Sequence, residues 1–178
     1  MRQSLYLSLI SPTKSIMGRL DYQRYKAIGS VLNIGSGENP AGLAGVHLDK
    51  KFYPGVPNLI VADAHHLPFQ QHSFDTVILG DVLEHVLKPH QVLAEARRVV
   101  RRRVIITVPY DNRLPPGQHV REAMALDHDR QHPTINFFSD DWLRELVASI
   151  RGHITNWQYV PEHNWMNWLI TVDFDGAT

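Results

Sequence analysis

The chain has 178 residues, with 18 Lys and Arg residues against 18 Asp and Glu residues, and it contains no cysteine. The length suits one domain whose core would bury roughly 70% of the unfolded surface. Zero formal net charge does not support a broad basic surface for nucleic acid, and the lack of cysteine excludes disulfides, thiol nucleophiles and cysteine-ligated metals. The apolar run 5–10 is too short for a membrane span, so we expect a cytoplasmic protein that contacts no membrane.

The first strong pattern along the chain is a strand that ends in two glycines. Residues 31–34 are an apolar run typical of a buried strand, and Gly35 and Gly37 follow it. Glycine allows the backbone to turn sharply and still lie against a ligand, so this turn indicates a nucleotide-type cleft. The pair alone is weak evidence, because a strand-to-loop turn in any α/β protein could use it.

Three more apolar runs, at residues 46–49, 59–62 and 75–80, predict strands that end at a carboxylate. The carboxylates are Asp49, Asp63 and Asp81. In an open parallel sheet the carboxyl ends of the strands form the ligand-binding edge, so we expect the three side chains at one edge. Any one of them taken alone could be a turn former or a helix cap.

The remaining elements alternate helix and strand and then end in two strands. Apolar periodicity predicts helices over 89–100, with Val92, Leu93, Ala96, Val99 and Val100 on one side, and over 139–149, with Ser139 as its cap. Strands are expected at 103–108, 153–160 and 165–174, the last two joined by a turn at 161–164. Residues 1–28 are expected to form an N-terminal arm or lid, and residues 29–178 a single domain.

Five segments within residues 31–108 together resemble a known family. They are Asn33-Ile34-Gly35-Ser36-Gly37, Asp49, Asp63-Ala64-His65-His66-Leu67-Pro68-Phe69, Ser73-Phe74-Asp75-Thr76-Val77 and Asp81-Val82-Leu83-Glu84-His85-Val86. The last three resemble the Asp-Ala-x-x-Leu-Pro-Phe, Ser-Phe-Asp and Leu-Glu-His signatures of the class I S-adenosylmethionine-dependent methyltransferases, in family order and spacing. This ordered set is much more specific than the glycines.

The resemblance implies an α/β fold and a cofactor, S-adenosyl-L-methionine. The implied fold is a Rossmann-like, mostly parallel seven-stranded sheet with helices on both faces and a C-terminal antiparallel hairpin. The glycine turn would pass under the methionine portion, Asp49 would take the ribose hydroxyls, and Asp81 would border the methyl-transfer site. Asp63 and the Ala64 amide would face the adenine. The implied cofactor-binding residues are Gly35, Ser36, Gly37, Asn39, Asp49, Lys50, Asp63, Ala64, Asp81 and Val82.

The sequence departs from the family pattern in three places. Asn33 stands where an acidic residue is common, Asn39 replaces the usual third glycine, and Arg101-Arg102-Arg103 replaces a Pro-Gly-Gly turn. Only residues 38–45 separate the glycine turn from the second strand, so we expect a shortened first crossover helix. A weak helix dipole at this point suits a sulfonium cofactor without phosphate better than a dinucleotide.

The irregular segment 109–138 is expected to face the acceptor, together with the N-terminal arm, because long loops beside a cleft are usually functional or disordered. The candidate catalytic bases are His85, His119 and His128, since histidine titrates near working pH. His132 could simply fix the loop, and Glu84 with His85 could brace a short helix.

Other sites fit the sequence less well. His119, His128, Asp129 and His132 match no metal-ligand spacing, so no metal is predicted. Asp111-Asn112 with Asp81 resembles the magnesium ligands of catechol-type O-methyltransferases, but Pro109-Tyr110 move the pair beyond the strand end, and a turn is the simpler interpretation. The arginine cluster over residues 97–103 could contact RNA, but balanced charge and helix-end placement argue against a nucleic-acid partner.

The expected function is methyl transfer to an oxygen or nitrogen of a small-molecule acceptor, by a monomer or homodimer. A catalytically inactive methyltransferase-like binding module is the main alternative. A nicotinamide oxidoreductase would share the glycine turn and Asp49, but it would not account for Asp63-Ala64 or Leu83-Glu84-His85.

Overall fold

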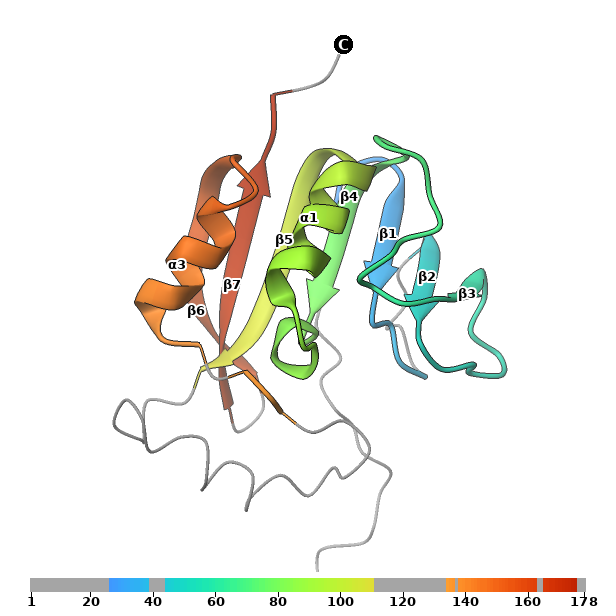
Figure 1. The fold of residues 1–178 in the computed structure, drawn as a ribbon, viewed down its shortest axis with the longest axis horizontal. Coiled ribbons are helices and arrows are strands. Elements are labelled where there is room, and N and C mark those ends of the chain that lie inside the picture. Colours follow the sequence, from blue (N-terminus) through green and yellow to red (C-terminus); the bar gives the residue numbers. More distant parts are fainter. Residues whose placement is uncertain (1–25, 39–43, 111–133, 137, 163–164, 176–178) are drawn as a thin grey trace, which may run out of the picture.

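The fold is built on one seven-stranded sheet with the strand order β3-β2-β1-β4-β5-β7-β6 (Figure 1). The computed structural model describes residues 26–38, 44–110, 134–136, 138–162 and 165–175. The strands are β1 (Val31–Ile34), β2 (Val46–Asp49), β3 (Leu59–Val61), β4 (Phe74–Gly80), β5 (Val100–Tyr110), β6 (His153–Glu162) and β7 (Trp165–Asp173). Strands β1 to β5 pair in parallel, and β7 lies antiparallel between β5 and β6. The predicted mostly parallel sheet with a C-terminal hairpin is confirmed.

Two helices cover one face of this sheet, α1 (Pro89–Val99) over β4 and β5 and α3 (Asp140–Ala148) over β6 and β7 (Figure 1). Their apolar sides are fully buried, as the periodicity predicts, and the Ser139 hydroxyl accepts a hydrogen bond from the Trp142 amide to cap α3. A short 3₁₀ helix, η2 (Leu83–His85), follows β4. The main core therefore lies between these helices and the sheet.

The opposite face of the sheet carries a much smaller apolar cluster, formed by Val31, Ile78, Ile105 and Leu169, with Ala27 packed against it. Among the described residues no helix covers this face, so helical cover on both faces stays a prediction. Asn33 also lies here, almost fully buried. Residues 1–25 of the arm expected over 1–28, and residues 39–43 of the first crossover, lie outside the described residues.

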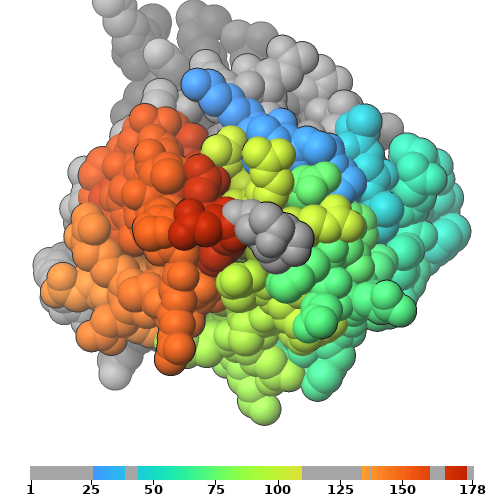
Figure 2. Space-filling model, turned by 90° about the horizontal axis from the view of Figure 1, so that it is seen from above, coloured from blue at the N-terminus to red at the C-terminus, as the bar shows by residue number. Residues whose placement is uncertain are grey.

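The junction between α1 and β5 corrects one prediction. β5 begins at Val100 directly after α1, so Arg101-Arg102-Arg103 belongs to the strand and forms no separate connection. The physical reason is that strand partners neutralise two of the charges: Arg101 pairs with Asp75 at 3.2 Å, and Arg103 pairs with Asp173 at 2.7 Å. Figure 2 shows the C-terminal end of β7 next to β5 on this side of the molecule.

None of the helices within the described ranges is both long enough and apolar enough to cross a membrane.

Candidate active site

The carboxyl ends of β1, β2 and β4 lie side by side at one edge of the sheet, at the bottom of Figure 1. The turn after β1 is attached to β2, because the Gly35 amide donates to the Leu48 carbonyl at 2.7 Å. Gly35 and Gly37 have φ angles of 65° and 60°, in the left-handed region that side chains disfavour. Both glycines are therefore required by the backbone conformation of the turn.

The two glycines face different surroundings. A Cβ at Gly35 would lie 2.5 Å from Cγ2 of Val82, so the turn packs directly against the residue that follows Asp81. A Cβ at Gly37 would meet nothing within 4 Å. The hydroxyl of Ser36, between them, is buried and has no hydrogen-bond partner among the described residues. Open space next to an unpaired hydroxyl fits a polar ligand lying against this turn.

Asp49 joins the glycine turn to the end of β2. Its carboxylate accepts from the Gly37 amide at 3.0 Å and from the Lys51 amide at 3.0 Å, and the residue is only 8% exposed. Each carboxylate oxygen can accept further hydrogen bonds, so the arrangement suits a diol. The neighbouring Lys50 is exposed. The structure therefore places Asp49 in direct contact with the glycine turn, as the order of the motifs predicts.

Asp63 and Ala64 follow β3, and the Ala62 amide connects them to β2 by donating to the Asp49 carbonyl at 3.0 Å. The Asp63 carboxylate accepts from the backbone amide of His65 at 2.9 Å and from its Nδ1 at 2.7 Å. These hydrogen bonds, the backbone one first, hold the pKa of Asp63 below its usual range. Asp63 is exposed and charged, so its second carboxylate oxygen can receive a donor from a ligand.

Asp81 follows β4 directly and has the left-handed conformation, with φ 52°. Its carboxylate accepts from the Thr107 hydroxyl at 2.9 Å and from the Asn167 side-chain amide at 3.1 Å. Burial raises the pKa of Asp81, while the hydrogen bond from Thr107 opposes the shift. Sequence reasoning missed Thr107 and Asn167, although a polar residue within each apolar strand is a usable signal.

Glu84 and His85 occupy η2 immediately after Asp81 and Val82. The Glu84 side chain is 2% exposed, and neither carboxylate oxygen has a hydrogen-bond partner among the described residues. Burial, and then the charge of Asp81, raise the pKa of Glu84 well above its ordinary value. His85 Nε2 lies 3.8 Å from Glu84 Oε1, too far for a hydrogen bond.

The residues before α3 are fixed onto η2. The backbone amides of Ile135 and Asn136 donate to the Glu84 carbonyl at 2.7 and 3.0 Å. The side chain of Asn136 donates to the carbonyls of Leu83 and Val86. These contacts are consistent with the bracing interpretation of Glu84 and His85, and they bring the end of the 109–138 segment to the edge near Asp81.

Asn39, His119, His128, His132 and Asp111-Asn112 lie outside the described residues. Within the described ranges no group of three His, Cys, Asp or Glu residues could hold a metal ion. The structure thus brings together Gly35, Gly37, Asp49 and Val82, with Asp81 on the adjoining strand end, while the ligand contacts of all of them stay predictions.

A comparison with known families matches the segment that contains the glycine turn and the three aspartates. The family described as a methyltransferase domain matches residues 33–108, which run from β1 to β5. A search of curated proteins finds no match.

Solved structures share the fold. The PH0226 protein of Pyrococcus horikoshii OT3 is 20% identical, covers 88% of this chain and 86% of its own, and has a TM-score of 0.62. The 1,6-didemethyltoxoflavin-N1-methyltransferase of Burkholderia thailandensis, solved with its substrate and S-adenosylhomocysteine, is 14% identical over 85% of this chain and 73% of its own, with a TM-score of 0.62. The putative methyltransferase in complex with the Haloferax volcanii Trm112 activator is 17% identical over 82% and 81%, with a TM-score of 0.60.

The matched segment carries the glycine turn and the three aspartates. TM-scores of 0.60 to 0.62 show that the three solved structures share the fold of this chain. Residues 33–108 therefore match the methyltransferase-domain family, and the chain as a whole has the fold of solved methyltransferases.

Proposed function

We propose that this chain transfers a methyl group from S-adenosyl-L-methionine to an oxygen or nitrogen of a small-molecule acceptor. The observation that carries the proposal is the hydrogen bond between Asp49 and the Gly37 amide, which joins two strand ends around the open side of the glycine turn. The same edge holds Asp81, whose carboxylate is already oriented by Thr107 and Asn167.

The residues present fit this cofactor. Asp49 can accept hydrogen bonds from both ribose hydroxyls, and Asp63 can accept one from the exocyclic amine of adenine. The space next to Gly37 leaves room for the amino-acid chain of the cofactor. The cofactor, when bound, supplies a methyl carbon on a sulfonium sulfur, so that the bond to the acceptor forms as the carbon–sulfur bond breaks. A neutral acceptor must then lose a proton.

The protein's own contribution is alignment and proton removal. Asp81 lies where it can orient an acceptor O–H or N–H, because Thr107 and Asn167 fix its carboxylate. Within the described ranges, the hydrogen bond to Oδ2 is a long contact of 3.4 Å from Asn167. We propose two described side chains as candidate bases, the Asp81 carboxylate itself and His85 on the adjoining helix. His119 and His128 remain candidates in the segment outside the described residues. Alignment of acceptor and methyl carbon supplies most of the rate increase in such transfers.

The experiment has two measurements on the same protein. Calorimetry with S-adenosylhomocysteine tests the cofactor site, and formation of S-adenosylhomocysteine from the methyl donor tests turnover across small phenols, sugars, amines and peptides. We expect binding and turnover with at least one small-molecule class. Binding without any turnover would favour the inactive binding module, and turnover only with a peptide would contradict the proposed acceptor class.

A further inference from the structure

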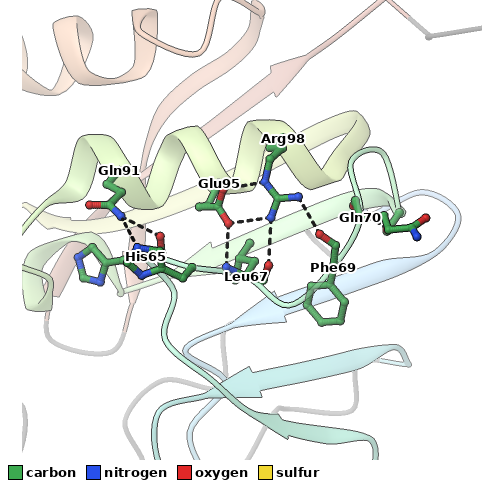
Figure 3. Close-up of polar contacts among 9 residues, drawn as sticks. His65, Leu67, Phe69, Gln70, Gln91, Glu95 and Arg98 are labelled. Atoms are coloured by element: carbon green, nitrogen blue, oxygen red, sulfur yellow. Dashed lines mark hydrogen bonds and ion pairs between the residues drawn. The ribbon is translucent and has the colours of Figure 1, made fainter.

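Three polar side chains on one side of α1 face the loop that follows β3. They are Gln91, Glu95 and Arg98, and spacings of four and three residues place them along one helix face. Figure 3 shows all three directed at the backbone of residues 65–69. An adjoining side of α1 is buried in the core, so the helix packs on the sheet with one side and contacts this loop with the next.

Glu95 and Arg98 hold the loop through its backbone. Glu95 Oε2 accepts from the Leu67 amide at 2.7 Å, while Arg98 donates to the Phe69 carbonyl at 2.7 Å and to the Leu67 carbonyl at 3.0 Å. The two side chains also pair with each other, with Arg98 Nε 2.7 Å from Glu95 Oε1. The hydrogen bonds from Arg98 lower the pKa of Glu95, so the carboxylate is charged at neutral pH. Charge-assisted hydrogen bonds of this kind are stronger than neutral ones.

Gln91 extends the same contact toward Asp63. Its side-chain amide donates to the His65 carbonyl at 3.0 Å, and His65 donates through its backbone amide and Nδ1 to Asp63. A continuous set of hydrogen bonds therefore runs from α1 to the carboxylate that is expected to face adenine. The Leu67 side chain is buried, and Phe69 packs edge-on against Phe74 at 4.9 Å between ring centroids, which anchors the far end of the loop.

We infer that Gln91, Glu95 and Arg98 are positioning residues that set Asp63 and Ala64 against the adenine of the cofactor. This inference rests on the proposed function, because it requires Asp63 to accept the exocyclic amine. None of the three side chains needs to touch the cofactor. Their hydrogen bonds take the place of the backbone pairing that an irregular loop lacks. They fix the Asp63 carboxylate before the ligand binds, which reduces the entropic cost of ordering the loop on binding.

The test compares Arg98→Lys and Glu95→Gln with a matched control, Arg103→Lys. Arg103 forms a similar two-pronged pair with Asp173, at 2.7 and 2.9 Å, and donates to the Lys26 carbonyl, but it lies away from the loop. Lysine keeps the charge at both positions and loses the planar fork. We expect both α1 variants to bind S-adenosylhomocysteine roughly tenfold more weakly, as loss of a charge-assisted contact implies, while the control binds normally.

Two readouts separate positioning from simple destabilisation. The Leu67 amide should exchange its hydrogen faster in both α1 variants than in the control, in protein that circular dichroism shows to be folded. S-inosylhomocysteine, whose ring carries oxygen in place of the amine, should bind more weakly than S-adenosylhomocysteine to the unmodified protein. The α1 variants should lose much of that preference.

Asp63→Asn distinguishes failure of the inference from failure of the proposed function. If Asp63→Asn loses the preference for the adenine compound but the α1 variants keep it, the positioning role is wrong and the adenine site stands. If Asp63→Asn keeps the preference, Asp63 does not read adenine and the inference is overturned with it. If the unmodified protein binds neither compound, the proposed function fails as well.

Discussion

The carboxylate of Asp49 and the backbone amide of Gly37 are 3.0 Å apart, in a hydrogen bond that fixes the turn after β1 to the end of β2. The other carboxylate oxygen accepts a hydrogen bond from the Lys51 amide, so Asp49 stabilises both the turn after β1 and the turn after β2. The residue expected to hold the ribose therefore also shapes the turn that is expected to lie beneath the methionine portion. Asp49 would thereby connect the two halves of the predicted cofactor site.

Asp49→Ala is expected to weaken binding of S-adenosylhomocysteine by roughly tenfold to a hundredfold, the effect of losing charged hydrogen bonds worth about 1.5 to 3 kcal/mol. Calorimetry measures the affinity, and circular dichroism checks that the variant is folded. Asp49→Asn is the matched control, because it keeps one acceptor for Gly37 and should bind better than Asp49→Ala. Normal binding by Asp49→Ala would remove this residue from the site.

Gly35→Ala should unfold at a lower temperature than Gly37→Ala. Both positions have a positive φ and share a backbone cost of about 1 to 2 kcal/mol, but only the new Cβ at Gly35 would meet Val82, at 2.5 Å. Overpacking of this kind adds about 1 to 3 kcal/mol. Val82→Ala in the Gly35→Ala background should recover part of the loss. Equal melting temperatures for the two single variants would contradict the close packing of Gly35 on Val82.

Much of the fold could be predicted because β1 to β4 are short apolar runs that are closely followed by glycine or aspartate. Periodicity also identified both helices, since each buries one side and exposes the other. The start of β5 could not be predicted, because three consecutive arginines look like a surface connection. Their inclusion in the strand depends on Asp75 and Asp173, and Asp173 is 70 residues from Arg103.

The same reason explains what was missed at the site. The order of the motifs predicted that the glycine turn, Asp49 and Asp81 share one edge of the sheet, and this is confirmed. The Asn167 contact with Asp81 spans 86 residues, and it depends on the antiparallel register of β5 and β7. The hydrogen bond from the Leu67 amide to Glu95 could not be predicted either, because a charged side chain outside the apolar side of a helix is usually solvated.

The stability of the protein should fall with rising pH through Glu84. Burial and the nearby Asp81 raise the pKa of this carboxyl, so the folded state holds a proton that the unfolded state releases above a pKa of about 4.3. The contribution is fully present below that unfolded pKa and is lost as the pH rises through the folded pKa, at about 1.4 kcal/mol per pH unit. Glu84→Gln cannot lose this proton.

The expectation is checked by thermal melting of Glu84→Gln and of the unmodified protein between about pH 5 and pH 8. This whole range lies above the unfolded pKa of about 4.3. The variant should gain relative stability as the pH rises. Asp81 titrates in both proteins and so largely cancels from the difference. A difference in melting temperature that stays constant with pH would contradict a neutral, buried Glu84.

Asp81→Asn should reduce turnover far more than cofactor binding. The substitution keeps the size of the side chain, and asparagine tolerates the left-handed backbone at this position, where φ is 52°. It removes a carboxylate that Thr107 and Asn167 hold in place, with hydrogen-bond distances of 2.9 and 3.1 Å. If this carboxylate takes the acceptor's proton, kcat should fall by roughly a hundredfold to ten-thousandfold, while the affinity for S-adenosylhomocysteine changes only a few-fold.

The pH profile makes this last expectation specific. A carboxylate base acts only when it is deprotonated, so kcat of the unmodified protein should increase as the pH rises through the pKa of Asp81, which burial raises above its ordinary value. Asp81→Asn should lack that rising limb, whereas Thr107→Val, which removes one hydrogen bond and keeps the carboxylate, should retain it at a shifted pH. Loss of that hydrogen bond withdraws a contact that favours the charged form, so the limb should move to higher pH. Steady-state kinetics with an acceptor identified by turnover measures all three proteins, and an unchanged kcat in Asp81→Asn would assign proton removal to another residue.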